Sequence, residues 1–205
     1  MVEFFVNGGA FMWPILAILI VGLAFVGERL YHLIRALNTK FDFALSLSEQ
    51  IENSGFDEAK KTCEGAVGPV ANLCYNALEV ADKGPDVVEK TLDQTAGIEM
   101  ASLEKNMTWI SLSIATAPMF GFLGTVWGMI QAFNDIKMAN DISPAVVAGG
   151  ISQALLTTAF GLIVAMIIQT CQNLFVSRID KLVLDMEEQS VRIMDYLYEQ
   201  EVKNK

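Results

Sequence analysis

Three long stretches without charged residues dominate the pattern of the chain. No Asp, Glu, Lys or Arg occurs at positions 4–27, 106–134 or 142–177, which are runs of 24, 29 and 36 residues. A bilayer core is about 30 Å thick and is crossed by about 20 apolar helical residues, so each run is long enough to span it. The pattern predicts an all-α membrane protein with three transmembrane helices.

The polar parts of the chain show helical periodicity interrupted by glycine. Apolar residues recur four apart within Phe41–Asn53, after which Gly55, Gly65, Gly68-Pro69 and Gly84-Pro85 predict breaks. One face of the predicted helix Asp86–Lys105 carries Val88, Leu92, Thr95, Met100 and Leu103. After Arg178 the same spacing joins Leu182, Met186, Ile193 and Leu197. We therefore expect the second and third transmembrane helices to continue unbroken into the cytoplasm.

These patterns divide the chain into four parts. Residues 1–37 form the N-terminal segment and first transmembrane helix, and residues 38–106 form a cytoplasmic helical segment. Residues 107–177 hold the second and third transmembrane helices, and residues 178–205 form a cytoplasmic C-terminal helix. The external connection at Asn134 to Pro144 is too short to be a domain.

Composition and charge agree with a membrane protein and exclude one class of partner. Hydrophobic residues make up 53% of the chain and charged residues 19%, whereas soluble domains average about 25% charged. The formal net charge is -10, and Lys60-Lys61 is the densest cationic pair. Phosphate binding needs a clustered basic face, so we expect membrane lipids and no nucleic acid among the partners.

The distribution of basic residues predicts the orientation, because short flanks rich in Lys and Arg stay in the cytoplasm. Basic residues flank the expected inner ends of the spans at Arg29, Arg35, Lys40, Lys105, Arg178 and Lys181. The N-terminus is therefore expected outside and the C-terminus in the cytoplasm. Met1–Ala10 has no basic residue, unlike a signal peptide, so we interpret the first run as a retained helix.

Small and hydroxyl-bearing residues gather on one face of each long span. On the second, Gly121, Gly128 and further small residues fall within about 100° of Thr125. The third span adds the candidate residues Ala154, Thr158 and Gly161, with Gln153 and Thr157 on the adjoining edge. Such faces are typical either of a tight helix pair or of a lined cavity. Both interpretations stay open on composition alone.

Chemistry-bearing groups are scarce in these spans. Neither long run contains a titratable Asp, Glu or His, so proton movement along them requires a carboxylate from another chain. Ser111, Ser113 and Thr116 point to different faces and are expected to bond to their own backbone. No catalytic constellation, metal spacing or phosphate loop occurs, so we expect no enzyme activity, metal or cofactor. The cysteines Cys63, Cys74 and Cys171 are interpreted as reduced packing residues.

Two segments carry a family resemblance. Ala117 to Ile130 (APMFGFLGTVWGMI) resembles the hallmark of the ExbB/TolQ/MotA proton-channel family. Gly150 to Leu162 (GISQALLTTAFGL) is similar to the family's second motif, and Glu28-Arg29 after the first span also recurs. Three spans instead of four favour the ExbB/TolQ branch over the flagellar MotA branch.

The resemblance implies a homopentamer in the inner membrane of a bacterium. Its second and third helices would line a central pore around the single transmembrane helices of an ExbD- or TolR-like dimer. The partner helix would carry the missing Asp, faced by hydroxyls at Thr125 and Thr158. Ion flow would then rotate the dimer and drive a TonB- or TolA-like periplasm-spanning protein, powering outer-membrane transport or maintenance.

This chain departs from the family pattern at two places. The ExbB/TolQ branch usually has Glu where Gln153 stands, and the family's late proline in the third span is absent from Ala165-Met166-Ile167. The Gln153 departure leaves a hydroxyl-and-water route or a different ion open, and hydroxyl-lined sites suit protons or sodium ions. The alternatives are a non-conducting membrane scaffold whose small-residue faces only pack helices, and a stator of another motor of the same family.

Overall fold

The computed structural model describes residues 2–36, 56–66, 68–139 and 144–203, and every regular element in these ranges is helical. The elements are α1 (Val2–Asn7), α2 (Met12–Ala36), α4 (Phe56–Gly65), α5 (Pro69–Glu79), a 3-10 turn η1 (Ala81–Lys83), α6 (Pro85–Glu104), α7 (Met107–Ala139) and α8 (Pro144–Lys203). The helix predicted at Phe41–Asn53 lies outside the described residues. Within the described residues, three helices are long and apolar enough to cross a bilayer, in agreement with the predicted number of spans.

The chain separates into two compact units. The first, which we call the spanning unit, comprises Met1–Arg29 and Asn106–Leu174. The second, the polar unit, comprises Leu30–Lys105 and Phe175–Lys205. Helix α8 belongs to both, because it continues without a break for 60 residues, as its periodicity predicted.

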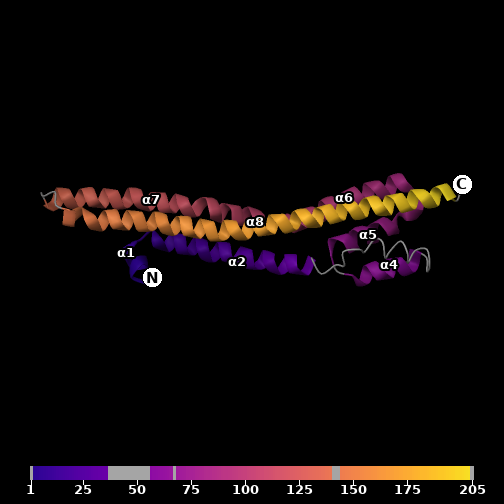
Figure 1. Ribbon diagram of the computed structural model, residues 1–205, viewed down its shortest axis with the longest axis horizontal. Helices are drawn as coiled ribbons and strands as arrows, with labels where there is room; N and C mark the ends of the chain where they lie inside the picture. Colours follow the sequence, from indigo (N-terminus) through magenta and orange to yellow (C-terminus); the bar gives the residue numbers. More distant parts are fainter. Residues whose placement is uncertain (1, 37–55, 67, 140–143, 204–205) are drawn as a thin grey trace. The chain divides into compact units, whose positions relative to one another are not determined.

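In the spanning unit, α7 and the first half of α8 lie side by side, with α2 along the pair (Figure 1). The first span begins at Met12, later than the charge-free run, because Gly8 and Gly9 separate it from the short helix α1. Gly9 has a φ of 71°, a left-handed conformation that suits glycine. The turn at Gly9 therefore ends α1 before the span starts.

The ends of α7 differ from the prediction. The helix continues to Ala139, beyond the predicted loop start at Asn134, because this stretch has no Gly or Pro and Lys137 lies in its favourable last turn. At the other end, α6 does not run unbroken into α7. Lys105 has ψ 136° and Asn106 has a φ of 64°, so a two-residue break separates them. The expectation of one continuous helix was wrong here.

The polar unit is built around the α4, α5 and α6 helices. Pro69 and Pro85 start α5 and α6 at the predicted glycine breaks, and Gly84 has a left-handed φ of 95°. The buried face of α6 consists of Val88, Leu92, Thr95 and Leu103. Met100 was predicted on this face but is exposed, because five residues after Thr95 the helix has turned about 140° away.

The interior of this unit includes two thiols. Cys63 on α4 and Cys74 on α5 are buried, in agreement with a packing role. Burial raises the pKa of Cys63 to about 11 and that of Cys74 to about 12, with the proximity of Cys63 adding to the second shift. Both side chains are therefore neutral thiols at physiological pH. Further along the chain, Leu182, Met186 and Ile193 form a buried stripe on α8.

Candidate ion pathway along α7 and α8

The small residues of α7 and α8 face each other across a very close helix contact. The α7 side consists of Ala117, Gly121, Gly124, Gly128 and Ala132, all buried. A Cβ built on Gly128 would lie 2.8 Å from the carbonyl oxygen of Gly150, and one on Gly161 would lie 2.7 Å from that of Ala117. At those distances only glycine fits. Two helix backbones approach this closely in lipid when both contribute small residues.

Four predicted pore residues therefore lie inside the helix contact of a single chain. Gly121 and Gly128 on α7 meet Ala154 and Gly161 on α8, with backbone atoms of one helix against the other. The tight-pair interpretation of these small residues accounts for their positions. A pore-lining role for these four stays a prediction.

The three threonines occupy different places around this contact. Thr157 is fully buried, packs against Gly124 and donates to the Ala154 carbonyl at 2.8 Å. Thr158 is partly exposed, and its hydroxyl donates to the Gly121 carbonyl on α7 at 3.4 Å. Thr125, also partly exposed, donates to Phe122 within its own helix at 2.6 Å. Thr157 thus packs the helices, whereas Thr125 and Thr158 lie at the edge of the contact.

The α2 helix and the turn before it cover the other edge of the pair. The Phe25 ring stacks on Trp109 with centroids 5.8 Å apart, and Phe11 lies 6.2 Å from Trp127. A Cβ at Gly22 would lie 2.5 Å from Ile168. These contacts place α2 against one side of α7 and α8.

Gln153 lies on this α2 side, packed closely against Gly9. A side chain at Gly9 would collide with the Gln153 amide, so the N-terminal turn covers this position. Seen down α8, Thr158 is turned about 140° from Gln153. Within one chain, Gln153 and Thr158 therefore occupy opposite edges, although both were predicted to line a pore.

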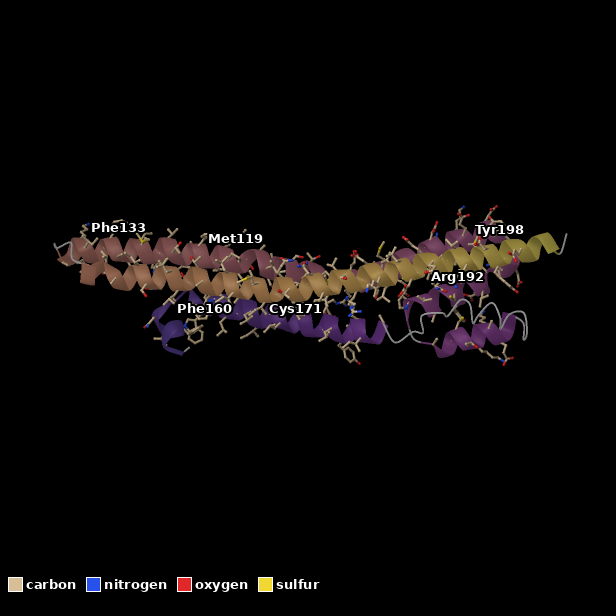
Figure 2. The ribbon with its side chains drawn as sticks, in the orientation of Figure 1. Met119, Phe133, Phe160, Cys171, Arg192 and Tyr198 are labelled. Carbon is tan, nitrogen blue, oxygen red and sulfur yellow. The ribbon has the colours of Figure 1, made fainter. Side chains whose placement is uncertain are left out.

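The outward faces of the helices are apolar. Met119 and Phe133 project from α7 away from α8 and are 65% and 64% exposed (Figure 2). On α8, Leu155 and Met166 are likewise exposed. Such side chains are compatible with lipid or with neighbouring apolar helices, in contrast to the hydroxyls on the Thr125/Thr158 edge.

A polar cluster that sequence reasoning missed lies further along the same pair of helices. The Gln172 side chain on α8 donates to the Ser111 hydroxyl on α7 at 2.6 Å. Gln169 donates to Asn173 at 3.0 Å and lies 3.5 Å from Gln172. The expectation that Ser111 bonds to its own backbone was wrong, whereas Ser113 and Thr116 do so. The i, i+3, i+4 spacing of the three amides was the signal in the sequence.

The inner end of the first span carries a charged group joined to α7. Arg29 is 2% exposed and lies 3.6 Å from Glu28. Glu28 also accepts a hydrogen bond of 2.9 Å from the Asn106 amide at the start of α7. This group fixes the end of α2 against the first residues of α7.

The polar groups on the Thr125/Thr158 edge of the α7 and α8 pair can hydrogen-bond to an ion or to water, but they cannot hold a proton. Its mid-span polar groups are hydroxyls and backbone carbonyls, which bond to water or to a cation. The charge-free runs 106–134 and 142–177 supply no carboxylate along it. A proton acceptor at mid-span must therefore come from another chain.

Comparison with known proteins identifies a family and several relatives. Residues 64–188 match the model of the MotA/TolQ/ExbB proton channel family. The chain is 29% identical over 179 residues to a putative biopolymer transport protein ExbB homolog of Methanothermobacter thermautotrophicus, covering 87% of this chain and 63% of that protein. It is 32% identical over 139 residues to the Tol-Pal system protein TolQ of Haemophilus influenzae, covering 68% and 56%.

A further match is shorter. The biopolymer transport protein ExbB of Xanthomonas campestris pv. campestris is 40% identical over 80 residues, covering 39% of this chain and 32% of that protein. The chain spans less than two thirds of the length of these relatives. The family match, the ExbB and TolQ relatives and the three apolar helices together show that the chain is a multi-pass membrane protein belonging to the ExbB/TolQ branch of the MotA/TolQ/ExbB proton channel family.

Proposed function

We propose that the chain is the ring-forming stator and channel subunit of an ion-motive-force-driven complex of the ExbB–ExbD or TolQ–TolR type. Five copies enclose a dimer of a single-span protein, with the N-terminus outside and the C-terminus in the cytoplasm of a bacterial inner membrane. The enclosed dimer transmits force to a TonB- or TolA-like protein that spans the periplasm. The work done is outer-membrane transport or maintenance.

The observation that carries this proposal is the position of Thr125 and Thr158. Both lie on the edge of the helix pair that α2 leaves open, and both are partly exposed. A polar edge in an otherwise apolar span is costly against lipid and is stable when it faces water, a cavity or a polar partner. Turned inward in a ring, this edge places ten hydroxyls around the enclosed helices, two from each of five copies.

The buried small residues between α7 and α8 support the proposal that the threonine edge lines a pore. Four small residues hold α7 and α8 at backbone contact: Gly121, Gly128, Ala154 and Gly161. The Thr125/Thr158 edge of the pair is therefore narrow and rigid. Gln153 lies on the α2 side, away from the proposed pore. The exchange of the branch's usual Glu for Gln at this position therefore leaves the proposed path intact.

The competing function is a non-conducting scaffold, for which the close small-residue contact is sufficient. Ion flux through proteoliposomes containing the chain and its single-span partner separates the two. Thr158→Leu fills the proposed path with an apolar side chain and is expected to abolish flux. Thr170→Leu on the same helix is the matched control, since that hydroxyl is exposed and donates to the Met166 carbonyl of its own helix.

The result has meaning only in an assembled complex, so native mass spectrometry accompanies the flux assay. Five copies of the chain with two of the partner are expected for both variants. Unchanged flux in an intact Thr158→Leu complex would support the scaffold. A monomer or dimer that does not retain the partner would contradict the ring itself.

A further inference from the structure

The cluster of Ser111, Gln169, Gln172 and Asn173, which we call the amide cluster, lies on the same edge as the two threonines. Ser111 precedes Thr125 by 14 residues and Gln172 follows Thr158 by 14, on helices that run in opposite directions. Fourteen residues rise about 21 Å and return to within about 40° of the starting direction. The Thr125/Thr158 pair and the Ser111/Gln172 pair are therefore two levels of one edge.

Large apolar side chains lie beside the Ser111/Gln172 pair on neighbouring faces. Leu112, next to Ser111, is 49% exposed, and Leu174, close to Gln172, is 62% exposed. Thr170 satisfies its hydroxyl on the Met166 carbonyl at 2.8 Å. Side chains that bond to one another across helices thus gather on the threonine edge, while lipid-compatible residues occupy its surroundings.

The cluster retains hydrogen-bonding capacity beyond its internal bonds. Ser111 accepts the bond from Gln172, so its own O–H is left to donate to a further acceptor such as water. Amide oxygens of Gln172 and Asn173 each have a second lone pair, and Asn173 is exposed. All four side chains are uncharged, so they can solvate a cation without forming an ion pair with it.

We propose that the amide cluster is the inner mouth of the ion path, a neutral site that passes a hydrated monovalent cation between the threonine level and the cytoplasm. This inference rests on the proposed function, because the ring turns the edge inward. Five clusters would surround the exit with hydroxyl and amide groups near the level where Lys105 and Arg178 mark the end of the charge-free runs. Uncharged oxygens keep water at the mouth and let the ion leave easily.

Gln172→Leu is the direct test in the co-reconstituted complex of chain and single-span partner. It removes the bond to Ser111 and the amide oxygen, and flux is expected to fall about tenfold, as for one lost hydrogen bond to the moving ion. Gln131→Leu is the matched control, being an exposed glutamine of α7 turned about 120° from Thr125. A proton gradient in sodium-free buffer and a sodium gradient, measured separately, identify the cation.

Gln172→Glu supplies a readout that a purely structural bond does not move. The carboxylate has nearly the same size. It cannot donate to Ser111 as the amide does, but it accepts from the Ser111 hydroxyl instead, so a bond between the two helices is kept and assembly is preserved. Flux is expected to become pH-dependent as this group titrates, with more cation passing when it is ionised. If Gln172→Leu does not assemble, the pH dependence of flux in Gln172→Glu tests whether the amide cluster lies on the ion path.

The outcomes separate this inference from the proposed function. Flux within twofold of the parent in Gln172→Leu, or no new pH dependence in Gln172→Glu, would show that the cluster only joins two helices. If Thr158→Leu also leaves flux unchanged, the proposed function fails as well. Loss of flux in Thr158→Leu with normal behaviour of both Gln172 variants would overturn the inner mouth alone.

Discussion

Adding one methyl group at Gly150 should force α7 and α8 apart. A Cβ built there lies 2.7 Å from the Gly128 carbonyl oxygen and 2.8 Å from the Ala132 Cβ. Carbon atoms pack best at about 3.5–4.0 Å, so the helices must separate locally by about 1 Å. Overpacking of this kind costs about 1–3 kcal/mol. In lipid, close packing is itself a main source of helix association, so little compensates for its loss.

The neighbouring Gly149 is the control for this change. A Cβ at Gly149 meets nothing within 4 Å, and the residue is in the same helix. Gly149→Ala is therefore expected to stabilise the helix by about 0.5–1 kcal/mol, through the general preference of helices for alanine. The difference between the two variants isolates the steric cost at Gly150 from the helix propensity that both share.

Thermal unfolding of the purified complex in detergent, followed by circular dichroism, measures this difference. Gly150→Ala should unfold at least about 2 °C below Gly149→Ala, from a steric cost of about 1–3 kcal/mol and about 2–4 °C per kcal/mol for a chain of this length. Its ion flux should also fall, because a wider gap weakens the 3.4 Å bond from Thr158 to Gly121. Equal midpoints, or a higher midpoint for Gly150→Ala, would refute the close contact.

Two further predictions concern other parts of the chain. Asn106→Gly should lower the free energy of unfolding by about 1 kcal/mol, because it loses the hydrogen bond to Glu28. Glycine adopts the φ of 64° at this position without strain. Asn106→Ala should cost about 1 kcal/mol more through left-handed strain, and equal values in urea unfolding would contradict this. Cys63 and Cys74 have pKa values raised to about 11 and about 12 from 9.0, so their contribution to stability is complete below pH 9 and is lost as the pH rises beyond it. Urea unfolding at pH 8 and pH 10 should show this loss in the parent and less of it in Cys63→Ala/Cys74→Ala; an equal loss in both would contradict the assignment.

The spans and the helix breaks of the polar unit were predictable because their signals are local. Charge-free runs measure span length, and Gly68-Pro69 and Gly84-Pro85 interrupt helices wherever they occur. The loop was predicted to begin at Asn134, but α7 continues to Ala139. Polar residues mark where the apolar span ends, and a helix can continue beyond that point. At the break, Asn106 donates to the Glu28 side chain of α2, a contact that no local pattern contains.

The candidate site was predictable in its residues and less so in its geometry. Helical angles place Thr125 and Thr158 beside small residues, but they do not say which helix covers which edge. Contacts of α2 put Gln153 on the other side from Thr158, through a neighbour 144 positions earlier in the chain, Gly9. The Ser111–Gln172 bond joins residues 61 apart, so only the pairing of α7 with α8 brings it about.

The central claim, that the Thr158 edge faces the enclosed partner helix, is tested most directly by site-specific cross-linking in the membrane. A cysteine replaces Thr158 in a chain whose native cysteines are changed to alanine, and a second replaces the intramembrane Asp of the single-span partner. Ala159→Cys is the control, since this exposed neighbour is turned about 100° from Thr158. The account predicts a disulfide-linked product from position 158 and none from position 159. A product from position 159 alone would contradict it.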